Sequence, residues 1–434
     1  MTVKADTSAK EIADVLQKGL GIRPSDSAIY KAKKGLLGCH DEELRNQVRY
    51  LPAYFAKLKS ADAGTIAVME PDLSVAEESH QSVAFKRCFV APAPARFAFP
   101  YCRPIIALDG TFLKGKVKLV LLLAATFDAN DSLIILAWAL VPSESTSSWT
   151  WFIRNLKTAF PRVESKLMTV VSDRDKGLMA AVDDQLPDVS HAYCCYHLAA
   201  NLKKHHGAST QPLFWRCVYA MTKAEFDLAM DQLRVRCKEA ADYLCAPEQE
   251  HTHWATYAFN NRRWGLVTSN LAEVANSLLV SIRSLPLLSM LSSIYEHQQE
   301  KYHARRLESQ GWSGYITPTA LRTLKLASDA ARAALSSYLR QPPISHVHQT
   351  YTTSNWSNTY TNPFVPVSTS DFPVAEWLEA PELTQTKGRP RIKRMEKGAV
   401  GGKARAVALC SVCQEEGHTR KSCSYVHLHS GSSI

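Results

Sequence analysis

Two short apolar segments that each end in an aspartate constrain the fold of this chain most strongly. The first covers residues 103–112 and delivers Asp109, and the second begins at Leu167 and delivers Asp173. A short apolar run that stops at a turn signal predicts a buried strand. Burying a carboxylate at the end of such a strand is costly unless a charged group or a hydrogen-bond donor pairs with it. We therefore expect both aspartates to face a charged partner, and the ends of strands are where metal ions and ligands collect in α/β sheets.

Each aspartate also has a plainer interpretation. Asp109 precedes Gly110, and Asp-Gly is a common turn pair in β-hairpins. Asp173 precedes Arg174 and Asp175, so it can serve as the N-cap of the helix that follows, with Asp175 as a competing ligand.

The residues around the aspartates predict how the strands connect. Residues 117–127 and 133–141 are apolar runs separated by a turn-rich stretch. A helix is expected over 147–160, where apolar residues recur at helical spacing. A further helix over 175–186 and a fifth strand over 189–194 follow Asp173. Three antiparallel strands, a helix and a fourth strand beside the first is the order of the ribonuclease-H-like fold, in which the two strand ends hold divalent metal.

After residue 206, the pattern of apolar residues changes. Residues 207–262 carry aromatic and apolar residues at helical spacing without a strand signal, which predicts an all-helical insertion in the fold. The first part of the core thus covers 103–206, and a core helix with following helices is expected over 263–340. The predicted fold class is α/β: a ribonuclease-H-like mixed sheet interrupted by helices, with a helical N-terminal segment and a C-terminal CCHC zinc knuckle.

Several motifs occur along this core in a fixed order. They are Asp109-Gly110-Thr111-Phe112, an Ala-Trp-Ala-Leu-Val run followed by Glu144 and Ser148-Trp149-Thr150-Trp151-Phe152, Ser172-Asp173-Arg174 with Gly177, Cys194-x-x-His197 with Asn201, and Thr268-Ser269-Asn270-Leu271-Ala272-Glu273-Val274-Ala275-Asn276. Together they resemble the core of Mutator-like element (MULE) transposases. The last motif matches the family's Thr-x-Asn-x-x-Glu-x-x-Asn pattern, which holds its third acidic residue. The resemblance runs from about residue 10 to about residue 425.

The resemblance implies a catalytic triad of Asp109, Asp173 and Glu273 that binds Mg²⁺ or Mn²⁺. Carboxylates suit these hard cations, and two such ions can activate a nucleophile and stabilise a leaving oxygen in phosphodiester chemistry. Glu296 is the alternative third acid. Cys194 and His197 are interpreted as a structural element beside the metal centre, or as half of a zinc site completed by distant ligands such as His205 or His206.

The N-terminal region is predicted to bind DNA. Residues 1–60 contain helical patterns that resemble a helix-turn-helix, and the second helix shows Lys31, Lys33 and Lys34 on its outer face. A helical hairpin packed on the body is an equal alternative. Residues 61–102 contain strand-like pieces and are expected to lead into the core, whereas residues 341–386 are rich in Ser, Thr, Pro and Asn and predict a linker.

The C-terminal region is basic. Residues 384–434 hold ten Lys and Arg against three Glu, in a chain of net charge +10, which indicates a polyanionic partner. Within 387–405, Lys387-Gly388-Arg389-Pro390-Arg391 resembles an AT-hook, in which Arg389 and Arg391 would enter an A·T minor groove. It also reads as a nuclear-import signal. Residues 406–425 contain Zn²⁺-ligand spacing for a zinc knuckle: Cys410, Cys413, His418 and Cys423.

These observations favour a DNA transposase that cleaves and transfers strands at element ends. Double-stranded DNA is the expected partner, with a homo-oligomer on DNA, a nuclear location and no membrane span, because apolar runs reach only about half the length that a crossing needs. Most of the eleven cysteines are scattered singly, which favours reduced thiols. The alternative is a domesticated or decayed, non-catalytic DNA-binding regulator, favoured by the absence of cysteine between 246 and 409, where larger family members carry a zinc module. A third, weaker alternative is an RNA-directed protein that uses the knuckle.

Overall fold

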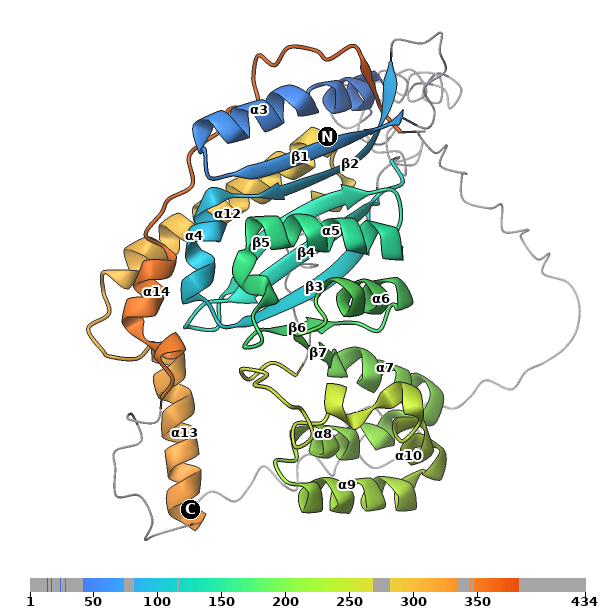
Figure 1. Ribbon diagram of the computed structural model, residues 1–434, viewed down its shortest axis with the longest axis vertical. Helices are drawn as coiled ribbons and strands as arrows, with labels where there is room; N and C mark the ends of the chain where they lie inside the picture. Colours follow the sequence, from blue (N-terminus) through green and yellow to red (C-terminus); the bar gives the residue numbers. More distant parts are fainter. Residues whose placement is uncertain are drawn as a thin grey trace, which may run out of the picture. The chain divides into compact units, whose positions relative to one another are not determined.

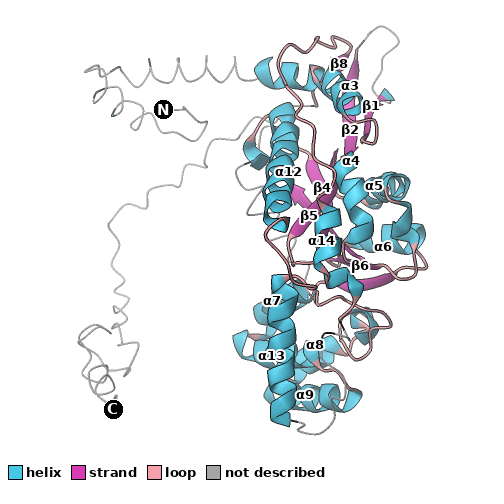
Figure 2. Ribbon diagram, turned by 90° about the vertical axis from the view of Figure 1, so that its left-hand side faces the viewer, coloured by secondary structure: helices cyan, strands magenta, loops and turns pink. Residues whose placement is uncertain are grey.

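The computed structural model describes residues 42–73, 82–114, 117–267, 282–334 and 347–381, together with five isolated positions. Its central feature is a mixed β-sheet with helices on both faces, α5 and α6 on one and α12 on the other (Figure 1, Figure 2). This confirms the predicted α/β class. Five strands of the sheet come from the stretch around the two aspartates: β3 (Ile105–Phe112), β4 (Val120–Phe127), β5 (Leu133–Val141), β6 (Thr169–Ser172) and β7 (Ser190–Tyr193).

These five strands lie in the order β5-β4-β3-β6-β7. The β3–β4 and β4–β5 pairs are antiparallel, whereas β3–β6 and β6–β7 are parallel. Helix α5 (Thr146–Ala159) connects β5 to β6, and α6 (Lys176–Gln185) connects β6 to β7. Both parallel connections therefore contain a helix, as a crossover between parallel strands requires.

Apolar residues explain why the centre of the sheet is continuous. Every residue of β4 except the last, and every residue of β5 except the first, is buried. Such runs are typical of strands covered on both faces. Helix α5 begins at Ser145, whose hydroxyl accepts a hydrogen bond from the Ser148 amide, and its Trp149 and Phe152 are fully buried. Each such side chain contributes about 1.5–3 kcal/mol through burial.

The predicted lead-in belongs to the same sheet. Strands β1 (Ile66–Asp72) and β2 (Val83–Ala91) extend it beyond β5, and both pairings that β2 makes with β1 and β5 are antiparallel. Helix α3 (Leu51–Ala61) precedes them and has a proline in its first turn, where a missing N–H costs nothing. The short helix α4 (Ala93–Ala98) then leads to β3.

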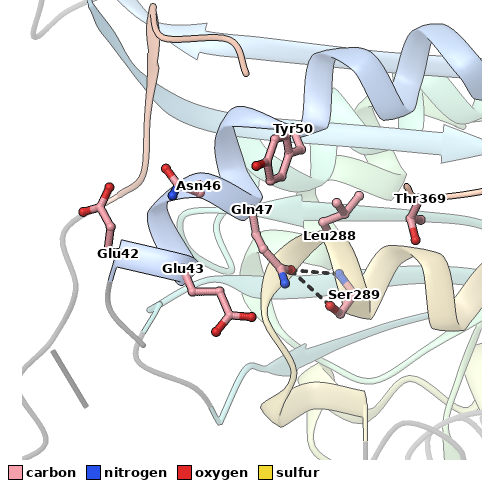
Figure 3. Close-up of a pocket in the computed structure, with 8 residues that line it drawn as sticks. All are labelled: Glu42, Glu43, Asn46, Gln47, Tyr50, Leu288, Ser289 and Thr369. Carbon is pink, nitrogen blue, oxygen red and sulfur yellow. Dashed lines mark hydrogen bonds between the residues drawn. The ribbon is translucent and has the colours of Figure 1, made fainter. Parts of the chain in front are cut away.

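Helix α12 (Leu287–Ser309) covers the face of the sheet opposite α5 and α6 (Figure 2). Its first turn is attached to the N-terminal helical region, because the Ser289 amide and hydroxyl both donate to Oε1 of Gln47, each at 3.1 Å (Figure 3). A cavity of about 570 Å³ lies at this junction. None of the predicted catalytic residues lines it. Helix α13 (Pro318–Ala334) follows α12.

Residues 347–381 fold onto the body, so the linker predicted over 341–386 is wrong for this part. They contain α14 (Thr353–Thr359) and β8 (Leu378–Glu379), which pairs with β2 in parallel. Trp356 is fully buried. No helical period is visible in this part of the sequence, because a few aromatic side chains, rather than a regular apolar stripe, attach the segment to the body.

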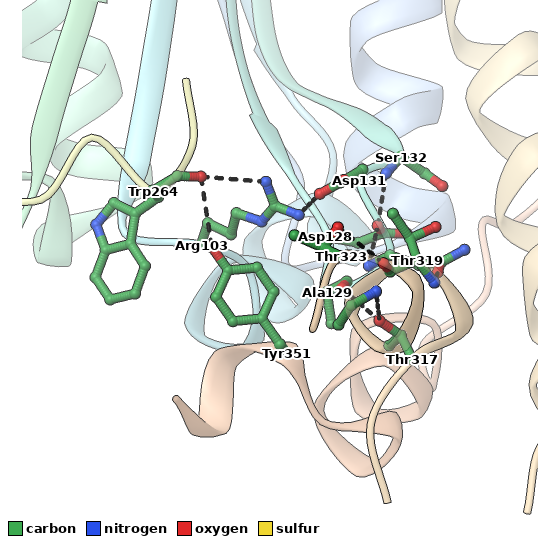
Figure 4. A network of polar contacts seen from close by, with 12 residues as sticks. Arg103, Asp128, Ala129, Asp131, Ser132, Trp264, Thr317, Thr319, Thr323 and Tyr351 are labelled. Atoms are coloured by element: carbon green, nitrogen blue, oxygen red, sulfur yellow. Dashed lines mark hydrogen bonds and ion pairs between the residues drawn. The ribbon is translucent and has the colours of Figure 1, made fainter. Parts of the chain in front are cut away.

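A buried carboxylate in the β4–β5 turn holds this segment in place. Oδ2 of Asp128 accepts hydrogen bonds from Nε1 of Trp356 at 2.7 Å and the hydroxyl of Tyr360 at 2.6 Å, while Oδ1 accepts from the amides of Asn130 and Ser132. Around the same turn, Arg103 pairs with Asp131 and Thr317 donates to the Ala129 carbonyl (Figure 4). The segment therefore depends on groups more than 200 residues away in the sequence.

The region after β7 is helical, as its sequence pattern predicts. It comprises α7 (Cys195–His206), α8 (Gln211–Tyr219), α9 (Lys223–Arg236) and α10 (Lys238–Leu244), and no strand occurs among the described residues from 207 to 262. These helices share a separate hydrophobic cluster in which Phe214 and Phe226 both pack on Trp254. Thr222 and Glu225 form a capping box at the start of α9. Across the described part of the chain, no helix is long and apolar enough to cross a membrane.

Candidate active site

The structure brings the two predicted aspartates to the same edge of the sheet. Asp109 lies in β3 and Asp173 follows the last residue of β6. In the parallel β3–β6 pair, Ala107 is opposite Val171. Because each aspartate comes two residues after its member of this pair, the two stand level, on backbones about 5 Å apart. Asp109 is thus not a hairpin turn residue but part of the strand.

Burial and charge both act on Asp109. Its side chain is 9% exposed. Burial, together with the neighbouring charges of Asp173 and Glu144, raises the pKa of the Asp109 carboxyl to about 7, while the charge of His197 opposes the shift. The charge of Asp173 therefore disfavours the ionised forms of both Asp109 and Glu144, and a cation placed among them would relieve this repulsion.

The alternative roles of Asp173 and Asp175 are separated by the structure. Asp175 is the N-cap of α6, because its Oδ1 accepts hydrogen bonds from the amides of Gly177 and Leu178 at 2.9 and 3.0 Å. Oδ1 of Asp173 accepts only from the Asp175 amide, at 3.1 Å, among the hydrogen bonds of the described residues. The capping role thus falls to Asp175, and Asp173 retains oxygen lone pairs for a ligand.

Glu144 is a further acidic residue at this site, and its sequence motif alone predicts no role for it. It lies immediately before Ser145, the N-cap of α5. Its Oε1 is only 2.6 Å from the position that a Cβ would occupy on Gly110, so the glycine beside Asp109 makes room for this carboxylate. Burial, Asp173 and Asp175 raise the pKa of Glu144. In the sequence, Glu144 could have been recognised as a site residue from its position just after an apolar run and just before a capping serine.

Cys194 and His197 also lie at this edge. The Cys194 amide donates to the Ser172 carbonyl at 2.7 Å, and Cys194 is the N-cap of α7. A hydrogen bond with the Cys194 side chain is the largest factor that raises the pKa of His197, and the charges of Asp173 and Asp109 raise it too. His205 and His206 lie at the other end of α7, at least about 12 Å along the helix axis. They cannot complete a zinc site with His197.

Replacing Cys194 by alanine is expected to lower the pKa of His197, because the hydrogen bond that favours the imidazolium is lost. Histidine NMR titration measures this, with the resonance assigned by His197→Gln. Cys195→Ala is the matched control, since the Cys195 thiol instead contacts the Trp254 carbonyl and Arg263. A His197 pKa that stays the same in Cys194→Ala would contradict the assignment.

The third predicted acid, Glu273, lies outside the described residues, as do Asn270 and Asn276. The chain on either side of it is anchored at the site. The Val267 carbonyl accepts a hydrogen bond from the Cys195 amide at 2.9 Å. On the other side, Arg283 donates to the Thr111 hydroxyl, and its carbonyl accepts from the Lys114 amide at 3.1 Å.

Glu296, the alternative third acid, lies in a different environment from Asp109 and Glu144. Glu296 lies in α12 and accepts a hydrogen bond from the Ser292 hydroxyl at 2.6 Å. Its charge acts on Tyr54 of α3, whose pKa it helps to raise. Neither Asp109 nor Glu144 has Glu296 among the charges that shift its pKa.

The described residues supply only part of the ligand set that a hard divalent cation such as Mg²⁺ requires. No three Asp, Glu, His or Cys side chains of the described residues are arranged to hold a metal ion. Two carboxylates, Asp109 and Asp173, are nevertheless level and mutually repulsive, and carboxylate oxygens are the ligands that Mg²⁺ and Mn²⁺ prefer. A further acid from outside the described residues is needed to complete the set.

The remaining predicted site residues lie outside the described part of the chain. These are the proposed DNA-binding residues Lys31, Lys33, Lys34, Arg389 and Arg391, and the proposed zinc ligands Cys410, Cys413, His418 and Cys423.

Comparisons of the sequence with known proteins show which protein family it resembles. The model of the MULE transposase domain matches residues 105–201, which run from the start of β3 into α7 and include Asp109, Glu144, Asp173 and His197. The chain is also 26% identical over 247 residues to Protein FAR-RED IMPAIRED RESPONSE 1 of Arabidopsis thaliana, a match that covers 54% of this chain and 28% of that protein. The chain thus spans little more than a quarter of the curated relative's length. Residues 105–201 are thus a MULE transposase domain, the family that the order of the motifs indicates.

Proposed function

We propose that the protein is a DNA transposase that performs metal-dependent strand cleavage and strand transfer at the ends of its element, on a ribonuclease-H-like core. The strand order β5-β4-β3-β6-β7 and the directions of its pairings support the core assignment. The observation that carries the proposal is the level placement of Asp109 and Asp173 on adjacent parallel strands. A buried carboxylate beside a second, partly buried one is unfavourable for folding and points to a cationic ligand.

Glu273 is proposed as the third acid. The Val267 carbonyl accepts a hydrogen bond from the amide of Cys195, next to Cys194. Val267 precedes Glu273 by only six residues, a length of chain that spans at most about 20 Å when extended and about 9 Å as helix. Arg283 returns the chain to Thr111, two residues from Asp109. Both anchors, Val267 and Arg283, therefore lie at the acidic edge, which supports Glu273 as the candidate for the third acid.

Asp109, Asp173 and Glu273 would hold two Mg²⁺ or Mn²⁺ ions, which supply polarisation of the scissile phosphate and a nucleophile of lowered pKa. The side chains themselves position charge. The charge of a protonated His197 lowers the pKa of Asp109 and so favours the ionised form of that carboxyl. The carboxylate of Glu144 lies against Gly110, where a larger residue would displace it, and its charge contributes to the raised pKa of Asp109.

The proposed partner is double-stranded DNA, with element ends and target DNA meeting in one nuclear complex of several copies of the chain. The basic segment at 387–405 and the Zn²⁺ knuckle at 406–425 are proposed as additional DNA contacts. The unequal distribution of charge along the sequence supports this assignment.

A second candidate is a domesticated or decayed, non-catalytic DNA-binding regulator. It is favoured by the similarity to a protein whose name refers to a far-red response rather than to transposition. The neighbouring carboxylates of Asp109 and Asp173 argue against it, because a regulator gains nothing from a buried acid beside a second acid of like charge.

The test is incubation of the full-length protein with DNA that carries the element's end sequence, in Mg²⁺ and in EDTA. Nicking by the wild type in Mg²⁺ is expected, with at least about a hundredfold loss in Asp173→Asn and Glu273→Gln. Glu296→Gln is the matched control, because it removes the same charge from α12 and should keep activity. Tight DNA binding without nicking in the wild type would overturn the enzyme and support the regulator.

A further inference from the structure

Helix α7 begins at the acidic site and carries a positively charged stripe away from it. His197, in the first turn, interacts electrostatically with Asp109 and Asp173. Asn201 and Lys204 follow at i+4 and i+7, so the three residues share one face of the helix. Lys203 lies about 100° around the helix from Lys204, on the adjoining flank of this face, and Asn201, Lys203 and Lys204 are all exposed.

The rest of the helix explains why this face is the outer one. Leu198, Ala199 and Leu202 are buried and pack in the hydrophobic cluster of the helical region. His206 is turned to α10, because its ring lies 5.9 Å from that of Tyr243 and its charge lowers the pKa of Glu239. The stripe is therefore defined as His197, Asn201, Lys203 and Lys204.

The charges of the stripe are not neutralised locally. Helix α7 contains no acidic residue over its 12 positions. In the described part of the chain, neither Lys203 nor Lys204 takes part in a salt bridge, unlike Lys223 on α9, which pairs with Asp227 at 2.6 Å. Cations in a last helical turn are stabilised by the helix dipole, which accounts for the lysines but not for the complete absence of acids.

We propose that this stripe binds the phosphate backbone of double-stranded DNA as it leaves the acidic site. From His197 to Lys204 the stripe extends about 10 Å along the helix axis, which corresponds to about three base pairs of B-DNA. Lysine provides a point charge and three donors to phosphate oxygens, and Asn201 adds a neutral donor. Such contacts set position rather than sequence preference. The inference rests on the proposed function, because it places DNA at the acidic site.

The test measures binding of the full-length protein to a random 30-base-pair duplex by fluorescence anisotropy, in EDTA, over a range of KCl concentrations. For the double variant Lys203→Ala/Lys204→Ala we expect an affinity loss of at least about tenfold at 100 mM KCl. The slope of log K against log salt should fall in magnitude by about 1 to 2.

The double variant Lys223→Ala/Lys238→Ala is the matched control, since it removes two charges from α9 and α10 and should leave the slope unchanged. A second measurement needs no variant: bound DNA should protect Lys203 and Lys204, but not Lys223, from acetylation detected by mass spectrometry. An unchanged slope in the first variant, or unprotected Lys203 and Lys204, overturns the proposal.

The proposal of a DNA-cleaving enzyme and the proposal of a DNA-binding stripe on α7 can be rejected independently of each other. Salt-dependent binding through Lys203 and Lys204 without any nicking by the wild type would retain the DNA surface and reject the enzyme. Mg²⁺-dependent nicking with an unchanged slope in Lys203→Ala/Lys204→Ala would retain the enzyme and reject the surface.

Discussion

Asp109→Asn is expected to make the metal-free protein more stable at pH 8 while it abolishes Mg²⁺-dependent nicking. The ordinary pKa of this carboxyl is 3.8 and in the folded protein it is about 7, so the folded state binds the proton more tightly than the unfolded state. Stability is therefore lost as the pH rises from about 4 to about 7. Asparagine removes this penalty, and the free energy of unfolding at pH 8 should rise by up to about 4 kcal/mol.

Denaturant unfolding in EDTA at pH 4 and pH 8 measures this effect, because the gain should be present at pH 8 and vanish at pH 4. Addition of Mg²⁺ should stabilise the wild type and not the variant, since ligand binding to the folded state alone adds to stability. Asp183→Asn, an exposed acid on α6, is the control and should change neither quantity. An equal gain at both pH values would show that the charge of Asp109 is not its cause.

Asp128→Ala is expected to destabilise the protein by about 3–5 kcal/mol, because it leaves the buried donors of Trp356 and Tyr360 without an acceptor. Asp128 is fully buried. Residues 347–381 should detach first, since this carboxylate connects them to the β4–β5 turn. Limited chymotrypsin digestion should then cut at Tyr360 far faster than in the wild type, and denaturant unfolding gives the free energy.

Glu376→Ala is the matched control for Asp128→Ala. It removes the same charge from an exposed position in residues 347–381, the segment that Asp128 holds, so its effect should stay within about 0.5 kcal/mol. A double-mutant cycle with Trp356→Phe isolates the contribution of the Trp356 hydrogen bond. If Asp128→Ala leaves Tyr360 resistant to chymotrypsin, the aromatic packing alone holds the segment.

The sequence was most informative where local periodicity and burial coincide. The apolar runs that become β4 and β5 are buried on both faces, and the stripe of α5 packs on the sheet, so each element could be predicted from its own residues. The order of the strands also follows, because a strand, two hairpin connections and a helical crossover leave few arrangements.

No single segment of the sequence determines which side chains become neighbours at the edge of the sheet. The sequence could not decide between Asp173 and Asp175, since both precede the same helix; the hydrogen bonds of Asp175 to Gly177 and Leu178 decided it. Glu144 becomes a site residue only because Gly110, on a different strand, leaves space for its carboxylate.

By itself, the sequence determined that this is an α/β chain whose two aspartates end apolar strands and whose middle section is helical, because these features depend on residues a few positions apart. The tertiary structure alone decided that Asp109 and Asp173 are level, that Glu144 and His197 act on them, and that residues 347–381 are attached through Asp128. The reason is physical: electrostatic interaction and desolvation depend on distance in space, and residues more than 200 positions apart meet only once the sheet and its covering helices have formed.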